Sequence, residues 1–329
     1  MINQVAIPSN IENDLTQVDA IIAQRLDARP LVSSIVSLYM GKAHNVHLRA
    51  ALVLLSAQQG EYDLETVVHP AAAVELIHQA FSIHNSLIGD QQLDSAHTDD
   101  THWNGSAALM TGDYLLALAS AEMALVPDSR IIRLLSQSVM AICEGMMSPD
   151  IDVLAEEAAI SEYLSLISNK TASLFASACK AGIICGHGRA DQIETLGRLG
   201  YHLGTAFHII DDVHDILPDN NANSSIGNRL RQGLVTLPLI YAVRSTQNAT
   251  LAAIAQTPLH DEARVHWTIN AIHHAQAGQR ALVDARLYLQ QAQEYLADLP
   301  DNDASQMLGE VLQSVAVSID LLNHRLMDP

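Results

Sequence analysis

Three aspartates lie close together in the segment HIIDDVHDIL, residues 208–217. Residues four apart in a helix lie one turn apart on the same face, so Asp211, Asp212 and Asp215 can direct their carboxylates toward a common point. Such oxygen ligands suit Mg²⁺, which keeps several waters and completes its shell with substrate phosphates. The spacing indicates a magnesium site for a diphosphate, although a solvated acidic helix face would show the same pattern.

The helix that must position these aspartates has two distinct sides. At 100° per residue, His208 and the aspartates fall on one side. The opposite sector holds five apolar residues, Leu199, Leu203, Ala206, Ile210 and Val213. We expect the apolar side to pack against neighbouring helices and the polar side to face a polar cavity.

A second segment, AAAVELIHQAFSIHNSLIGD (71–90), is apolar almost all round, which predicts a helix in the centre of a bundle. His78, Phe81 and Asn85 share one stripe of it at i, i+3 and i+7. A buried stripe that combines a histidine, an aromatic ring and an amide indicates the lining of a cavity.

The other segments also show helical periodicity, and strand-like alternation is hard to find. Turn-rich stretches such as LPDNNANSSIGN (217–228) separate the helical runs, and none is long or biased enough to be a linker between domains. We therefore predict an all-α fold and a single domain over residues 1–329.

Composition and charge narrow the function. Acidic residues number 37 against 17 basic ones, and the formal charge of −20 argues against nucleic-acid binding. An anionic substrate would need metal ions or a local cation. The three cysteines form no CxxC pair, the N-terminus lacks a signal-peptide pattern, and no apolar run reaches membrane-spanning length. We expect a cytoplasmic protein without a membrane span.

Six segments carry a family resemblance: RAALVLLSA (49–57), AAAVELIHQAFSIH (71–84), LMTGDYLLALA (109–119), NKTASLFASACKAG (169–182), LGTAFHIIDDVHDI (203–216) and GLVTLPLIYA (233–242). In order and spacing they resemble the trans-isoprenyl diphosphate synthases of the polyprenyl synthetase family, from about residue 40 to about residue 245. The resemblance implies an isoprenoid synthase-type helical bundle around a central cavity, which commonly dimerises.

In that family, two aspartate-rich motifs on facing helices hold Mg²⁺ against an allylic diphosphate. Its ionisation gives a carbocation that isopentenyl diphosphate attacks. The resemblance implies that the three aspartates form the second motif and that Lys170 and Thr171 contact the diphosphate. It also implies that Arg49 and His78 belong to the isopentenyl diphosphate site.

The chain departs from the family at the first motif. Directly after His84, where the family has DDxxD, the residues are Asn-Ser-Leu-Ile-Gly (85–89), and Asp90 follows. The family's arginine pair falls on Asp94 and Ser95. Neutral oxygens are weak Mg²⁺ ligands beside carboxylates, so two of the usual metals lose their main anchor.

Two smaller departures concern the cavity. His208 replaces the family's glutamine one turn before Asp212, where it could contact metal or diphosphate, act as a base, or be a satisfied polar residue. Phe81 lies four residues before the lost motif, where bulky rings in the family shorten the product pocket. It could equally be plain core.

Three functions remain open. The favoured one is a Mg²⁺-dependent enzyme that ionises one allylic prenyl diphosphate and releases diphosphate in a terpene-synthase-like lyase step. Such an enzyme would work with fewer metals than usual or with further ligands such as His208, Asp90 or Asp94. A chain-elongating geranylgeranyl or farnesyl diphosphate synthase is the first alternative, but it needs cations for two diphosphates. The second is a non-catalytic subunit of a heteromeric synthase, against which the intact second motif argues. We expect a homodimer, with a heteromer as the alternative.

Overall fold

The computed structural model describes residues 7–27, 29–40, 47–89, 105–155, 157–218, 226–255 and 257–327. In these ranges the chain forms helices and no strand, so the predicted all-α fold is confirmed. The long helices are α1 (Glu12–Asp27), α4 (Leu64–Gly89), α5 (Gly105–Met123), α6 (Ser129–Met146), α9 (Ala190–His214), α14 (Ala277–Ala297) and α15 (Asp303–Met327). The shorter ones are η1 (Ser9–Ile11), α2 (Pro30–Met40), α3 (Leu48–Ala57), α7 (Glu157–Ile167), η2 (Ser168–Ala172), α8 (Ser173–Cys185), α10 (Asn228–Arg231), α11 (Leu237–Thr246), α12 (Ala249–Ile254) and α13 (Glu262–His274).

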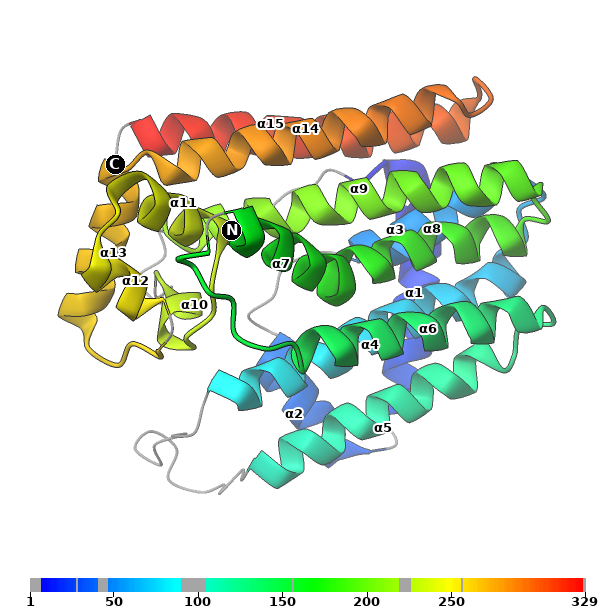
Figure 1. Ribbon diagram of the computed structural model, residues 1–329. Helices are drawn as coiled ribbons and strands as arrows, with labels where there is room; N and C mark the ends of the chain where they lie inside the picture. Colours follow the sequence, from blue (N-terminus) through cyan, green and yellow to red (C-terminus); the bar gives the residue numbers. More distant parts are fainter. Residues whose placement is uncertain are drawn as a thin grey trace.

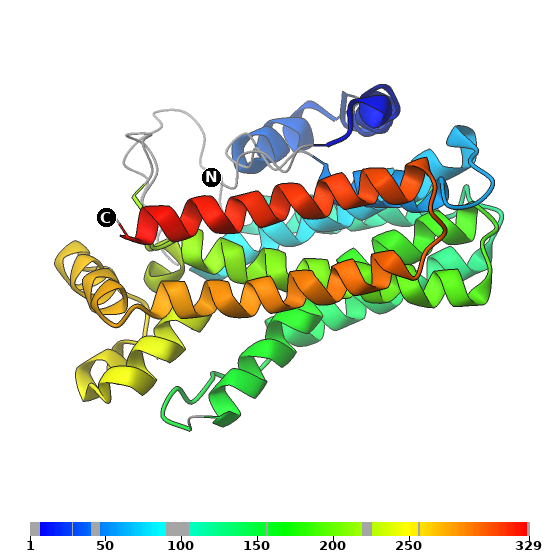
Figure 2. The same ribbon diagram turned by 90° about the horizontal axis from the view of Figure 1, so that it is seen from above.

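The long helices lie alongside one another, and the short helices α10 to α13 gather at one end of the bundle (Figure 1). Helix α9 packs between α8 and α14, and α3 packs between α4 and α8. Figure 2 shows that α14 and α15 lie side by side and cover this arrangement. The C-terminal end of α9, which carries the aspartates, therefore points toward the short helices.

The buried faces agree with the sequence periodicity. All five apolar residues predicted to pack on α9 are fully buried. The apolar segment of α4 is also buried, as its uniform hydrophobicity predicted. Among the described residues, one hydrophobic core extends from Ile11 to Leu326. The single domain over residues 1–329 stays a prediction.

Two glycines bring α9 close to α8. A Cβ atom at Gly200 would lie 2.6 Å from the carbonyl oxygen of Phe175, and one at Gly204 would lie 2.8 Å from Phe175 Cβ. Real side chains do not tolerate such contacts. The missing side chains thus allow the helix approach that brings residues 170–171 near the polar side of α9.

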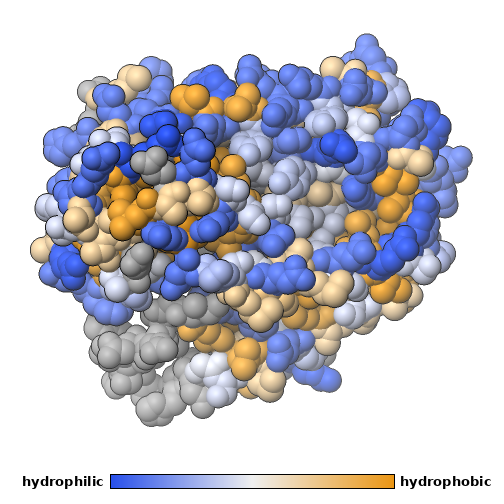
Figure 3. All heavy atoms as spheres, in the orientation of Figure 1, coloured by the Kyte–Doolittle hydropathy of each residue, from blue (hydrophilic) through white to orange (hydrophobic). Residues whose placement is uncertain are grey.

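The face shown in Figure 3 is mainly hydrophilic, with separate groups of hydrophobic residues between the polar ones. Among the described helices, none combines the length and the apolar character needed to cross a bilayer.

Candidate active site

A cavity of about 500 Å³ opens among α3, α4, α6, α7, η2, α8, α9 and α10. Its apolar wall includes Phe81, Ile142, Met146, Leu166, Leu174 and Phe207. Eight of the ten predicted site residues line it, namely Arg49, His78, Phe81, Asn85, Lys170, Thr171, His208 and Asp211. Asp212 and Asp215, the other two, are not part of its lining. The structure therefore brings most of the predicted residues to one cavity, with an apolar side and a polar side.

The turn η2 presents Lys170 and Thr171 to this cavity. It is a π-helical turn between α7 and α8, and such turns occur often at functional sites. Burial lowers the pKa of Lys170, and the positive charge of Arg229 lowers it further, whereas Asp212 acts in the opposite direction. The ammonium group is thus placed in a partly desolvated position among charged neighbours.

Arg49 enters the cavity from the start of α3. Its guanidinium lies over the ring of Phe175, 4.6 Å from the centroid, and the residue is 9% exposed. Burial lowers the pKa of Arg49, while the charges of Glu75 and Asp211 oppose this shift. Burial, followed by the charge of Arg49, holds the pKa of His78 well below its ordinary value, so His78 is neutral at pH 7.

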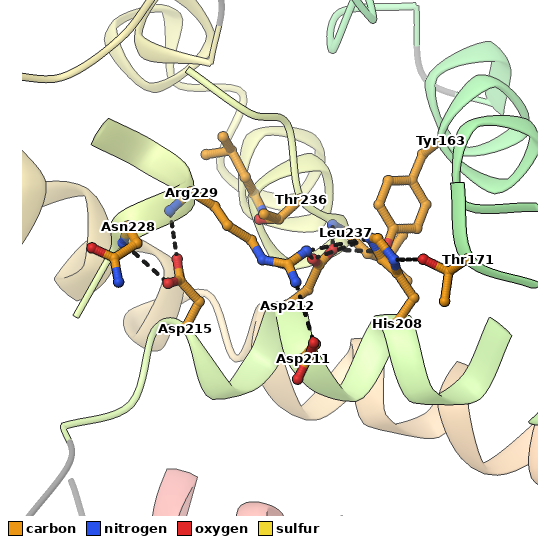
Figure 4. Close-up of polar contacts among 11 residues, drawn as sticks. Tyr163, Thr171, His208, Asp211, Asp212, Asp215, Asn228, Arg229, Thr236 and Leu237 are labelled. Carbon is orange, nitrogen blue, oxygen red and sulfur yellow. Dashed lines mark hydrogen bonds and ion pairs between the residues drawn. The ribbon is translucent and has the colours of Figure 1, made fainter. Parts of the chain in front are cut away.

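The three aspartates at the C-terminal end of α9 have different surroundings (Figure 4). Asp211 and Asp212 lie in the helix, and Asp215 directly follows its last residue. Asp211 lines the cavity, and 38% of its side chain is exposed. Asp212 is buried: its Oδ2 accepts hydrogen bonds from the Tyr163 hydroxyl at 2.6 Å and from the Leu237 N–H at 3.1 Å. Asp215 accepts hydrogen bonds at 3.0 Å from the N–H groups of Asn228 and Arg229.

Two of these carboxylates therefore lie at helix N-termini. Leu237 is the first residue of α11, and Asn228 and Arg229 are the first two residues of α10. Unpaired N–H groups and the positive end of the helix dipole favour a carboxylate at such a position. Asp212 and Asp215 hold the segment that follows α9 against its C-terminal end.

Arg229 lies among the aspartates as an internal cation (Figure 4). Its Nη1 pairs with Asp212 Oδ1, and its Nη2 lies 3.6 Å from Asp211 Oδ2. Burial acts to lower the pKa of Arg229, but the charges of Asp212, Asp211 and Asp215 outweigh it and raise the pKa. Burial raises the pKa of Asp212 to about 6, against the opposing effects of Arg229, the Tyr163 hydroxyl and the Leu237 N–H.

His208 links the cluster formed by Arg229, Tyr163 and the three aspartates to Thr171. Arg229 Nη1 lies 3.3 Å from His208 Nε2, and His208 Nδ1 shares a hydrogen bond of 2.6 Å with Thr171 Oγ1. Arginine can only donate, so Nε2 accepts and the imidazole carries its proton on Nδ1, which donates to Thr171. Burial, followed by the charges of Arg229, Lys170 and Arg49, holds the pKa of His208 well below its ordinary value.

The arrangement does not match a metal site shared by all three aspartates. Within the described ranges, no group of three or more His, Cys, Asp or Glu side chains is placed to hold a metal ion. Arg229, Tyr163 and backbone N–H groups already take up the oxygens of Asp212 and Asp215, and Asp211 is the aspartate of the motif that lines the cavity. The predicted metal role of the set stays a prediction. Asp90 and Asp94 lie outside the described residues.

Sequence reasoning missed two residues of the cluster, Arg229 and Tyr163. Arg229 contacts an aspartate 17 positions earlier, and Tyr163 contacts the same aspartate across 49 positions. One signal was available for Arg229: basic residues are few in this chain, and Arg229 and Arg231 lie between the aspartates and the segment GLVTLPLIYA. No local pattern distinguishes Tyr163.

Comparison with known proteins places this chain in a family. The model of the polyprenyl synthetase family matches residues 33–272, beyond both ends of the resemblance seen in the sequence. The chain is 30% identical over 308 residues to heptaprenyl diphosphate synthase component 2 of Geobacillus stearothermophilus, covering 93% of this chain and 96% of that protein. It is 30% identical over 297 residues to nonaprenyl diphosphate synthase of Mycobacterium tuberculosis, covering 88% of this chain and 85% of that protein.

A solved structure shows the same fold. The polyprenyl synthase from Caulobacter crescentus, complexed with calcium and isoprenyl diphosphate, superposes with a TM-score of 0.84 at 26% identity, covering 97% of this chain and 98% of that one. The predicted isoprenoid synthase-type bundle is thereby confirmed. The chain belongs to the polyprenyl synthetase family, a family of prenyltransferases.

Proposed function

We propose that the protein binds one allylic prenyl diphosphate, ionises it and releases diphosphate in a terpene-synthase-like step. The observation that carries the proposal is the cavity of about 500 Å³, in which cationic residues meet an apolar wall. This volume lies within the roughly 300–1,000 Å³ typical of small-molecule sites. A diphosphate group fits the cations, and a prenyl chain fits the apolar wall.

The residues divide into two roles. Lys170 and Arg49 favour the negatively charged diphosphate, and the charge that develops on the leaving group strengthens this interaction during ionisation. His78 and His208 are held neutral, so they add no positive charge beside a forming carbocation. Phe81 is buried in the cavity wall and limits the depth available to the prenyl chain.

The proposal includes Mg²⁺ that arrives with the substrate. Mg²⁺ is usually bound by one or two carboxylates together with substrate phosphates. Asp211 is the carboxylate of the motif that lines the cavity and is suited to this role. When bound, the ion would neutralise charge on the departing diphosphate.

The comparisons support the substrate class. Relatives with high coverage are named as heptaprenyl and nonaprenyl diphosphate synthases, and the similar structure from Caulobacter crescentus contains isoprenyl diphosphate. These names also favour the first alternative, a chain-elongating synthase. That reaction requires a second diphosphate in the same cavity, where two polyanions repel each other strongly. Asn85, at the position where the first acidic motif of the family begins, supplies no charge for a further metal.

A structural observation favours a second alternative, the non-catalytic subunit of a heteromeric synthase. Asp212 and Asp215 hold the start of α11 and of α10, so they would stabilise the fold of a subunit that binds no metal as well. The aspartates therefore no longer argue against this function. For the catalytic enzyme we propose a homodimer, and for the non-catalytic subunit a heteromer with a catalytic chain.

Incubation of the purified protein with geranylgeranyl diphosphate and Mg²⁺, with and without isopentenyl diphosphate, separates the three functions. The proposed reaction predicts diphosphate release that does not need isopentenyl diphosphate. Release that strictly depends on isopentenyl diphosphate would establish the elongating synthase instead. Inactivity under both conditions, restored by a co-purified catalytic subunit, would establish the non-catalytic role.

A further inference from the structure

His208 lies between a group that can only donate a hydrogen bond and a group that can donate or accept one. Arg229 Nη1 lies 3.3 Å from Nε2 of the ring, and Thr171 Oγ1 lies 2.6 Å from Nδ1 (Figure 4). A guanidinium has no acceptor, whereas a hydroxyl has one proton and two lone pairs. Nε2 therefore accepts from Arg229, and Nδ1 carries the proton and donates to Thr171. The three side chains form a relay of hydrogen bonds with one direction.

The opposite tautomer of His208 would place two N–H groups against each other. With the proton on Nε2, the ring would point it at Arg229 Nη1. The carboxylate oxygen Oδ1 of Asp212 lies 3.8 Å from Nε2, which is too long for a hydrogen bond. That oxygen is already paired with Arg229. The surroundings of Nε2 thus favour an unprotonated nitrogen at this position.

Neighbouring side chains hold the first two members of the relay in place. Arg229 pairs with Asp212, and the other oxygen of this carboxylate accepts from the Tyr163 hydroxyl at 2.6 Å. The ring of Tyr163 also lies edge-on to the ring of His208, with the centroids 6.4 Å apart. Only 18% of the His208 side chain is exposed, so few water molecules can compete for its ring nitrogens. Buried groups therefore set the direction of the relay.

The last member of the relay, Thr171, lines the cavity. Its oxygen accepts from His208, and with the described residues its hydroxyl makes no other hydrogen bond. The hydroxyl proton is therefore free to donate into the cavity. A donated proton attracts an anionic ligand, whereas a lone pair directed at the same ligand would repel it. The relay thus determines the sign of the interaction between Thr171 and the ligand.

We propose that His208 is a positioning residue that fixes the hydroxyl of Thr171 as a hydrogen-bond donor to the ligand in the cavity, with its own tautomer set by Arg229. The inference rests on the proposed function for its ligand class, an anionic diphosphate. It gives Arg229 an effect on the ligand that needs no contact with it. No proton is transferred along the relay.

The tautomer of His208 tests the first part of this inference. Full-length protein with ¹⁵N-labelled histidine would be examined at mildly alkaline pH by long-range ¹H–¹⁵N correlation, with His208 assigned from the loss of its signals in His208→Gln. We expect the proton on Nδ1. His273 is an internal control of the opposite kind, because its Nε2 lies 3.0 Å from the carbonyl oxygen of Ile216 and must donate. A proton on Nε2 of His208 would overturn the inference.

Calorimetric titration of the full-length protein with inorganic diphosphate and Mg²⁺ tests the second part. We expect Thr171→Val and His208→Leu each to bind about tenfold more weakly, since a hydrogen bond to a charged group is lost. The double variant should bind no more weakly than Thr171→Val, because His208 acts through Thr171. His208→Gln is the conservative variant and should bind nearly as the unaltered protein does, since its amide can accept from Arg229 and donate to Thr171.

Thr171→Val and His208→Gln both leave the ion pair between Arg229 and Asp212 intact, so they test the relay without removing this buried pair. The inference is overturned if the unaltered protein does not bind diphosphate, or if His208→Leu binds as the unaltered protein does. It is also overturned if the losses of the two single variants multiply in the double variant. The expected tautomer and binding losses without diphosphate release from geranylgeranyl diphosphate would instead contradict the proposed function and leave the role of His208 standing.

Discussion

The guanidinium of Arg229 pairs with the carboxylate of Asp212, of whose side chain only 1% is exposed. In the same motif, Asp211 is 38% exposed and lies 3.6 Å from the same guanidinium. Adjacent aspartates thus differ in their contribution to the fold and in their access to a ligand.

Replacement of Asp212 by alanine should therefore destabilise the protein, whereas replacement of Asp211 should not. Removal of one partner from a buried ion pair costs about 3–5 kcal/mol, because the other charge is left without compensation. The ion pair between Arg229 and Asp211 has a longer distance, 3.6 Å, and is partly exposed. A pair of this kind contributes roughly 0–1 kcal/mol to the free energy of unfolding. Urea unfolding should show a large loss for Asp212→Ala and a small one for Asp211→Ala, while Asp211→Ala abolishes diphosphate release. Equal losses of stability would contradict the different roles of the two aspartates.

Asp215 should behave as the N-terminal cap of α10. It accepts hydrogen bonds from the first two N–H groups of that helix, so Asp215→Ala should cost about 0.5–2 kcal/mol in the free energy of unfolding. Asp215→Asn retains an oxygen acceptor and is the matched control, with a smaller loss expected. If the alanine variant is as stable as the original protein, the capping role is wrong.

Leu203 tests the packing side of α9. It is fully buried, and Leu203→Ala should cost roughly 2–5 kcal/mol because it removes buried methyl groups and leaves a cavity. Leu321→Ala on α15 is a suitable comparison, since Leu321 is 59% exposed and should change stability by no more than about 0.5 kcal/mol. Thermal and urea unfolding of both variants measure the difference.

His78 should make stability depend on pH below neutrality. Burial, followed by the charge of Arg49, keeps its pKa well below the ordinary value, so the folded protein takes up this proton only at a lower pH than the unfolded chain does. The unfolded chain does so near its ordinary pKa of about 6.5, and stability therefore falls as the pH falls. His78→Gln should flatten the slope of unfolding free energy against pH. Identical slopes for both proteins would show that His78 does not titrate differently on folding.

The fold could be predicted from the sequence because its signals are local or continuous along the chain. The apolar sector of α9 and the uniformly apolar segment of α4 follow from helical periodicity, and both are buried as predicted. The ordered series of family-like segments identified the isoprenoid synthase-type bundle. The family match nevertheless extends to residue 272, beyond the point where the helices have recognisable motifs.

The arrangement of the aspartates could not be predicted in the same way. Spacing alone brings the three carboxylates to one face, but their partners come from α7, α10 and α11. The position of α10 depends on a return of the chain to the end of α9, where Gly227 adopts a positive φ of 77° and donates to Asp215 O at 2.7 Å. Such a contact follows from tertiary structure and leaves no periodic signal in the sequence.

The number of diphosphates that one chain binds tests the central claim most directly. The protein would be saturated with the unreactive analogue geranylgeranyl thiolodiphosphate in the presence of Mg²⁺ and then titrated calorimetrically with isopentenyl diphosphate. Our account predicts one analogue bound per chain and no saturable binding of isopentenyl diphosphate. Binding of one isopentenyl diphosphate per chain beside the analogue would contradict it and would establish the two-substrate site of a chain-elongating synthase.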